Sequence, residues 1–175
     1  RDVRMDKNIV IIGMPGSGKT SLGQKLSEKL NYDFIDMDDY IEESSGRKIA
    51  SMFEEGEMVF REEEIKASRD LADSSRTVIS TGGGIITQEA SMEALKENGL
   101  ILFLDRPLEN IEKDIERDSR PLLKDDKSRL EKLYEERINL YRLYADLTIE
   151  NTLDEDSVVD LMVEAVNEYE SRVEE

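Results

Sequence analysis

A glycine-rich loop near the N-terminus constrains the fold more than any other part of the 175-residue chain. Residues 13–20 read GMPGSGKT and satisfy the pattern G-x4-G-K-[ST]. The loop follows the apolar run 9–12, typical of a strand buried on both faces, and precedes a helical pattern that starts at Lys19. In such a loop backbone N–H groups surround phosphate oxygens, and the new helix adds a favourable dipole. The sequence therefore predicts a site for a nucleoside triphosphate.

Within this loop, Lys19 is expected to reach the β- and γ-phosphates, and the Thr20 hydroxyl to ligate Mg²⁺. The alternative is a plain glycine-rich turn beside an exposed lysine. A dinucleotide loop is excluded, because Ser21 stands where the third glycine of G-x-G-x-x-G is needed. The residues predicted here to bind ATP are Gly16, Ser17, Gly18, Lys19, Thr20 and Ser21.

Short apolar runs alternate with longer amphipathic patterns along the rest of the chain. Strands are expected at 7–12, 32–36, 77–80, 100–104 and 147–150, and helices from 19, within 39–55, and at 57–72, 88–97, 108–117, 128–144 and 154–173. This order predicts an α/β fold with a five-stranded parallel sheet and helices on both faces. The carboxyl ends of its strands would meet at one edge, where ligands bind. We expect one domain over residues 1–175, with residues 1–5 a linker or an added segment.

The composition excludes several classes of protein. With 42 acidic and 24 basic side chains the formal charge is −18, which argues against a nucleic-acid partner. No apolar stretch approaches the roughly 20 residues of a membrane span, and the first residues lack the apolar run of a secretory signal. Without Cys or His the chain has no disulfide, imidazole base or Ser-His-Asp triad. We expect a cytoplasmic protein whose chemistry depends on carboxylates, Lys, Arg, hydroxyls and backbone groups.

Two carboxylates, Asp36 and Asp38, follow the second predicted strand. If the alternation of the strand continues through them, both point toward the catalytic edge. One could then hold Mg²⁺ while the other orients an acceptor hydroxyl. The alternative is a helix N-cap with surface acids. The chain is short and has no Asn-Lys-x-Asp motif of GTPases, so it fits a small-metabolite kinase.

A series of motifs in order resembles the shikimate kinase family over roughly residues 7–150. They are GMPGSGKT at 13–20, DMD at 36–38, G-E-x2-F-R-x2-E at 56–64, GGG at 82–84, RPLL at 120–123 and R-x2-L-Y at 137–141. The resemblance implies a three-layer α/β/α P-loop NTPase fold, nucleoside-monophosphate-kinase-like, with a short lid at about 117–127. It also implies Mg²⁺-dependent transfer of the γ-phosphoryl of ATP to the 3-hydroxyl of shikimate, in aromatic amino-acid (chorismate) biosynthesis, by a monomer.

The resemblance also assigns a clamp for the shikimate carboxylate to Arg61 and Arg137. The planar fork of a guanidinium suits this role, because it can bind a carboxylate through two parallel hydrogen bonds. Glu64, three residues after Arg61 on the same predicted helix, could hold that fork in place. The alternative for Arg61 is an ordinary ion pair with Glu57 on a charged helix.

Further roles follow from the same resemblance. Asp38 would be the base for the attacking hydroxyl, and Asp36 would serve the Mg²⁺ shell. Gly82, Gly83 and Gly84, without β-carbons, would let the substrate approach backbone donors, although a plain loop is the alternative.

The lid arginines complete the set. Arg120 resembles the lid residue that touches the transferring phosphate, and would act with Lys19 on the charge of the transition state. Arg117 is a candidate for stacking on adenine. The family usually has a longer lid between these arginines, whereas here only Asp118 and Ser119 separate them.

Rival interpretations remain open from the sequence. Another small-metabolite kinase on this scaffold, such as a gluconate kinase, is one. A nucleotide-binding regulatory module without turnover is another. Phe53 and Phe60 could line the ring pocket or belong to the core.

Overall fold

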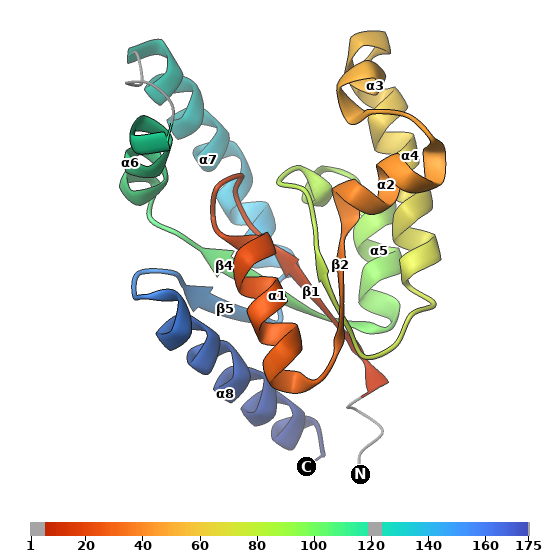
Figure 1. Cartoon of the computed structure of the whole chain (residues 1–175), viewed down its shortest axis with the longest axis vertical. Helices are drawn as coiled ribbons and strands as arrows, with labels where there is room; N and C mark the ends of the chain where they lie inside the picture. Colours follow the sequence, from red (N-terminus) through yellow and green to blue (C-terminus); the bar gives the residue numbers. More distant parts are fainter. Residues whose placement is uncertain (1–5, 119–123, 175) are drawn as a thin grey trace.

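The computed structural model describes residues 6–118 and 124–174. The elements follow the expected alternation (Figure 1). They are β1 (Asn8–Ile12), α1 (Lys19–Leu30), β2 (Asp33–Asp36), α2 (Met37–Ser45), α3 (Ile49–Glu55), α4 (Glu57–Leu71), β3 (Thr77–Ser80), the 3-10 helix η2 (Ile85–Thr87), α5 (Glu89–Glu97), β4 (Gly99–Asp105), α6 (Leu108–Asp118), α7 (Lys124–Tyr144), β5 (Leu147–Glu150) and α8 (Glu155–Glu174).

The five strands form one parallel sheet in the order β2-β3-β1-β4-β5. β1 is central, and Ile9 pairs with Val78 of β3 on one side and Leu100 of β4 on the other. All five residues of β1 are buried, as expected for a strand that is covered on both faces. The predicted α/β class and parallel sheet are confirmed.

Helices cover both faces of the sheet, so the molecule has three layers (Figure 1). Alternate residues of each strand face opposite layers, and two separate apolar clusters result. One face carries Ile9, Ile11, Leu102 and neighbours packed on α1 and α8. The other carries Val10, Ile12, Phe103 and neighbours packed on α4, α5 and α7.

At the end of β2, the expected continuation of the strand is wrong and the helix N-cap, the alternative interpretation, is confirmed. The strand ends at Asp36, and α2 begins at Met37. The cause is a helix cap, because a carboxylate oxygen of Asp36 accepts a hydrogen bond from the backbone N–H of Asp38 at 3.0 Å. Asp38 therefore lies in the first turn of a helix and not on an extended strand.

A second expectation concerns where the lid ends, since the sequence predicts a lid at about 117–127 and a helix from 128. α7 begins at Lys124, so residues 124–127 are helical rather than loop. Asp125 and Asp126 in its first turn complement the helix dipole. Residues 1–5 and Arg120 lie outside the described residues.

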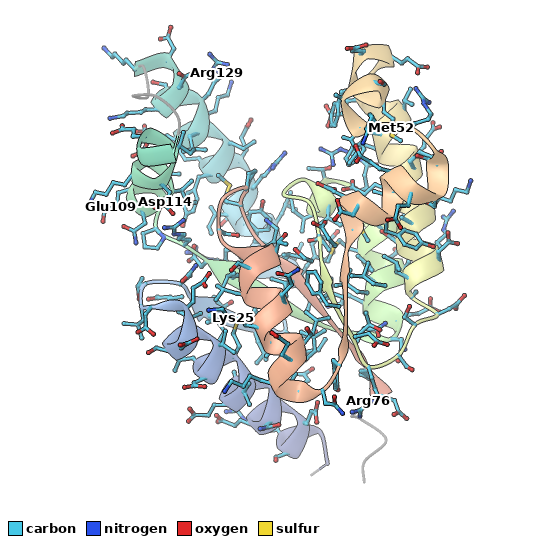
Figure 2. The ribbon with its side chains drawn as sticks, in the orientation of Figure 1. Lys25, Met52, Arg76, Glu109, Asp114 and Arg129 are labelled. Atoms are coloured by element: carbon cyan, nitrogen blue, oxygen red, sulfur yellow. The ribbon has the colours of Figure 1, made fainter. Side chains whose placement is uncertain are left out.

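Figure 2 draws the side chains on the ribbon, and the residues labelled there other than Met52 carry charged groups. Lys25 of α1 forms an ion pair with Glu155 of α8 at 3.0 Å. Met52 is the buried residue of α3. Within the described ranges, no helix has the length and apolarity needed to cross a membrane.

Candidate active site

In the loop between β1 and α1, the side chain of Lys19 is enclosed by the backbone of the loop itself. Lys19 is 8% exposed, and its ammonium donates to the carbonyl oxygens of Gly13 at 2.7 Å and Met14 at 2.9 Å. Burial lowers the pKa of Lys19 to about 8, Asp38 opposes that shift, and Arg137 adds to it. Gly18 has φ of 97° and caps α1 without a side-chain hydrogen bond, which leaves the N-terminus of the helix available to an anion.

Beside this loop lies a cavity of about 450 Å³. Asp36 and Asp38 both line it, as expected. They do so from the N-cap and first turn of α2 and not from a continued strand. Burial raises the pKa of each, and their mutual repulsion raises that of Asp38 further, while Lys19 lowers both. The lining residues are Pro15, Gly16, Gly18, Lys19, Thr20, Ser21, Asp36, Asp38, Thr81, Gly82 and Gly83.

Arg61 on α4 is held by two carboxylates. Its guanidinium donates to Glu64 at 2.8 Å and to Glu57 at 3.1 Å. The pair with Glu57, which was the alternative interpretation, therefore exists. Arg61 is nevertheless only 5% exposed and Glu64 is fully buried, so this is an interior cluster rather than a solvated helix face. Burial raises the pKa of Glu64, and Arg61 opposes that shift.

The glycine run is where these groups converge. A β-carbon on Gly82 would lie 3.3 Å from Asp38 Oδ1 and 3.5 Å from Glu64 Oε2. Both oxygens are buried and have no hydrogen-bond partner among the described residues. A β-carbon on Gly84 would collide with the guanidinium of Arg61. The glycines therefore leave space between one cation and two unsatisfied acceptors.

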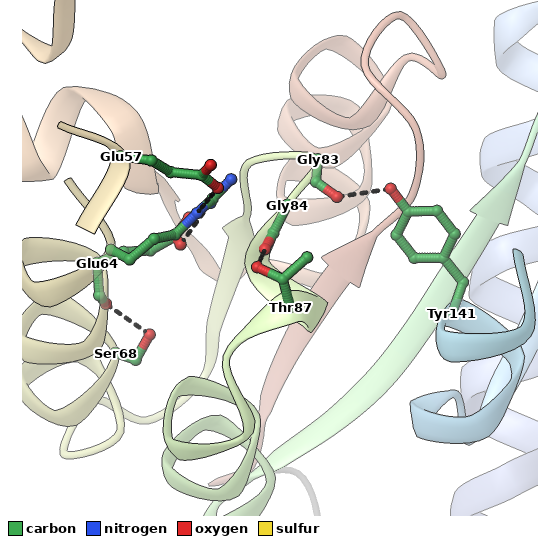
Figure 3. Close-up of polar contacts among 8 residues, drawn as sticks. Glu57, Glu64, Ser68, Gly83, Gly84, Thr87 and Tyr141 are labelled. Carbon is green, nitrogen blue, oxygen red and sulfur yellow. Dashed lines mark hydrogen bonds and ion pairs between the residues drawn. The ribbon is translucent and has the colours of Figure 1, made fainter. Parts of the chain in front are cut away.

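Arg137 approaches from the opposite side, on α7. It acts electrostatically on Lys19, on Glu64 and on the hydroxyl of Tyr141. Figure 3 shows Gly83 and Gly84 between Glu64 of α4 and Tyr141 of α7. The structure thus brings the two predicted clamp arginines to one region from two separate elements.

Three contributions were not predicted as parts of the site. Arg106, after β4, donates to the carbonyl of Gly16 at 2.9 Å and pairs with Asp114 of α6 at 2.5 Å. Asn151, after β5, donates to the carbonyl of Ser17 at 2.8 Å. Both line a second cavity of about 690 Å³ that extends from the loop toward α8. Their position just beyond strand ends is the one signal that could have indicated them.

A third contribution is Tyr141, whose hydroxyl donates to the carbonyl of Gly83 at 2.6 Å. Phe53 and Phe60 stack on each other with ring centroids 4.9 Å apart, and the guanidinium carbon of Arg61 lies 5.2 Å from the centre of the Phe60 ring, so Phe60 borders the proposed clamp without lining the 450 Å³ cavity. Arg120 and the side chain of Arg117 fall outside the described part of the chain.

Comparison with known proteins identifies this arrangement. A sequence profile of the family described as shikimate kinase matches residues 15–167. A shikimate kinase of Clostridium beijerinckii is 43% identical over 162 residues, which cover 93% of this chain and 96% of the relative. The chain belongs to the shikimate kinase family. As a member, it is an ATP-dependent phosphotransferase.

Solved structures agree with the family assignment. A shikimate kinase of Acinetobacter baumannii, in complex with shikimate, superposes with a TM-score of 0.84 at 34% identity and covers 93% of each chain. A gluconokinase of Sinorhizobium meliloti matches with a TM-score of 0.65 at 15% identity, over 99% of this chain and 97% of its own. The gluconokinase shares the fold alone, so the rival small-metabolite kinase gains no support beyond its architecture.

Proposed function

We propose that the chain transfers the γ-phosphoryl group of ATP to the 3-hydroxyl of shikimate, giving shikimate 3-phosphate and ADP. The observation that carries this proposal is the convergence at the glycine run. Two buried oxygens that have no hydrogen-bond partner within the described part of the chain, on Asp38 and Glu64, and one buried guanidinium, on Arg61, surround Gly82 and Gly84 beside the phosphate loop. A small acid with ring hydroxyls has the matching groups, because its hydroxyls donate and its carboxylate accepts.

The nucleotide is bound by the backbone of the phosphate loop, residues 16–21, and the free N-terminus of α1. The ammonium of Lys19 leaves its carbonyl partners for the β- and γ-phosphates. Because the transferring group spreads negative charge in the transition state, this preorganised cation stabilises it. Arg106 and Asn151 hold the loop in place from the ends of two strands.

Magnesium would be held by Thr20 and Asp36. The donor set fits, because Mg²⁺ prefers hard oxygen ligands and one or two carboxylates with water. The hydroxyl of Thr20 lies 3.3 Å from that of Ser80, and both Thr20 and Asp36 line the cavity. When bound, the ion neutralises charge on the phosphate oxygens.

At the acceptor end, the oxygen of the 3-hydroxyl forms a bond to the γ-phosphorus while the bond from that phosphorus to ADP breaks. Asp38 accepts the proton that the hydroxyl loses. Its raised pKa favours this role, since a base poised nearer neutrality transfers protons more efficiently. Arg61 and Arg137 bind the carboxylate of the ring. Arg120 touches the transferring phosphate and Arg117 stacks on adenine, two roles that rest on the sequence motif.

A coupled assay of ADP release tests the activity, with shikimate, quinate, gluconate or no acceptor. We expect release with shikimate only. Release with gluconate would favour the rival kinase, and release with none a nucleotide-binding module. Asp38→Asn and Arg61→Ala should abolish turnover while nucleotide binding persists, and Lys19→Ala should slow the transfer step. Parental turnover in either of the first two variants contradicts the assigned roles.

We also propose that the chain acts as one kinase domain and as a monomer in the cytoplasm, on the pathway to aromatic amino acids. Sedimentation of the active enzyme at assay concentration tests the monomer.

A further inference from the structure

Tyr141 is the largest fully buried side chain of the described residues, and it lies beside the proposed acceptor site. Its ring stacks on Phe103 of β4 with centroids 5.1 Å apart. A buried tyrosine hydroxyl needs a polar partner. Here that partner is the carbonyl oxygen of Gly83, 2.6 Å away in the glycine run (Figure 3).

Arg137 lies four residues before Tyr141 on α7, about one helical turn, so the two side chains lie on the same face of that helix. Burial raises the pKa of Tyr141, whereas the charge and hydrogen bonding of Arg137 lower it. A phenol can donate one hydrogen bond and accept another. Tyr141 therefore donates to the backbone of Gly83 and can accept from the guanidinium of Arg137.

Gly83 is also in close contact with the phosphate loop. A β-carbon on Gly83 would lie 2.7 Å from the ring of Pro15, so the two loops touch. The carbonyl of Gly83 is thus held on one side by Tyr141, while the residue packs on Pro15 on the other.

We propose that Tyr141 is a positioning residue for the acceptor, acting through Arg137 and Gly83. Its hydroxyl holds the guanidinium of Arg137 in the orientation that binds the shikimate carboxylate. The same hydroxyl holds the backbone of the glycine run in position beside the shikimate ring. The inference rests on the proposed function and deepens it, because it adds a residue that need not touch either substrate.

Tyr141→Phe tests the role, since it removes the hydroxyl and keeps the ring that packs on Phe103. We expect the KM for shikimate to rise about tenfold, the effect of losing one well-placed hydrogen bond. The KM for ATP should change less than about twofold. Tyr144→Phe, on the same helix, is the matched control and should behave as the parent does.

A double variant separates positioning from a merely structural role. In an Arg137→Ala background, kcat/KM for shikimate should fall less than about threefold on adding Tyr141→Phe, because one of the two groups through which Tyr141 acts is gone and only its hydrogen bond to Gly83 remains. A full further tenfold loss would overturn the coupling to Arg137. A lower melting temperature of Tyr141→Phe with an unchanged KM for shikimate would overturn the positioning role.

Failure of the two proposals can be told apart. A parent enzyme that releases no ADP with shikimate overturns the proposed function and the acceptor role of Tyr141 with it. A parent that is active with shikimate, beside a Tyr141→Phe variant with the same KM, overturns the positioning role alone.

Discussion

At the scale of single residues, the site depends on charges taken out of water. Glu64 is fully buried, with one oxygen on Arg61 and the other unsatisfied among the described residues. Removing one member of such a pair leaves the other charge poorly compensated. The Arg61–Glu64 pair therefore contributes both to binding of the acceptor and to the stability of the folded protein.

Glu64→Gln should lower the free energy of unfolding by about 2 kcal/mol, because the buried guanidinium of Arg61 loses its interior counter-charge. Glu57→Gln removes the partner that is largely exposed and should cost less than about 1 kcal/mol. Urea unfolding of the two variants measures the difference. Equal losses would contradict an interior role for Glu64.

The lowered pKa of Lys19 gives a pH dependence. Its charge is present below pH about 8 and is lost above it. A bound triphosphate favours the charged form of Lys19. Binding of ATP near pH 8.5 should therefore take up roughly half a proton or more per site. Calorimetry in buffers of different ionisation enthalpy measures this uptake. Lys19→Arg, always charged, should show none; equal uptake would assign the proton to another group.

Several residue roles could be predicted from the sequence, because one local motif encodes them. Lys19 and Thr20 belong to eight consecutive residues that form the loop wherever a strand and a helix flank them. Arg106 and Asn151 could not be found in this way. They bind backbone carbonyls 90 and 134 residues distant in sequence, and no spacing pattern reports such contacts.

At the scale of elements, the order of strands and helices was predictable because apolar periodicity survives in each segment. The start of α2 was left open, because the alternation of a short strand cannot by itself decide between a longer strand and a helix N-cap. The side chain of Asp36 forms that cap. Asp36 ends β2, caps α2 and lines the cavity, so the two elements meet at a proposed ligand of the magnesium ion.

The glycine run provides the test at this scale. None of its three glycines has a positive φ, so space and not backbone conformation requires them. Gly83→Ala should reduce kcat/KM for shikimate at least about tenfold, because its β-carbon would displace Pro15 and the phosphate loop.

Gly46→Ala is the matched control, because at Gly46 the backbone conformation and not the surrounding space favours glycine. Gly46 has φ of 71° and nothing within 4 Å of its β-carbon position among the described residues, and it lines neither of the two cavities described above. Alanine there should cost about 1 kcal/mol of stability through backbone strain and leave kcat/KM unchanged. Parental activity of Gly83→Ala would show that the two loops need not touch.

At the scale of the whole molecule, the formal charge of −18 surrounds a small cationic centre. Self-repulsion of this size destabilises the compact state, and salt screens it. We expect the melting temperature to rise by several degrees, about 3–6 °C, between 20 and 200 mM KCl. Scanning calorimetry measures it, with choline chloride as the control for specific potassium binding. A flat response would show that the acids are already compensated.

The crowding at residues 82–84 has a consequence for anyone who would redesign this enzyme. Three glycines touch the phosphate loop, the carboxylates, a guanidinium and a tyrosine at once, so a change there disturbs both co-substrates together. New acceptor preferences should instead be sought at positions 61 and 137, whose side chains come from the helices α4 and α7 and not from the phosphate loop or the glycine run, with Glu64 exchanged together with Arg61 so that no buried charge is left unpaired.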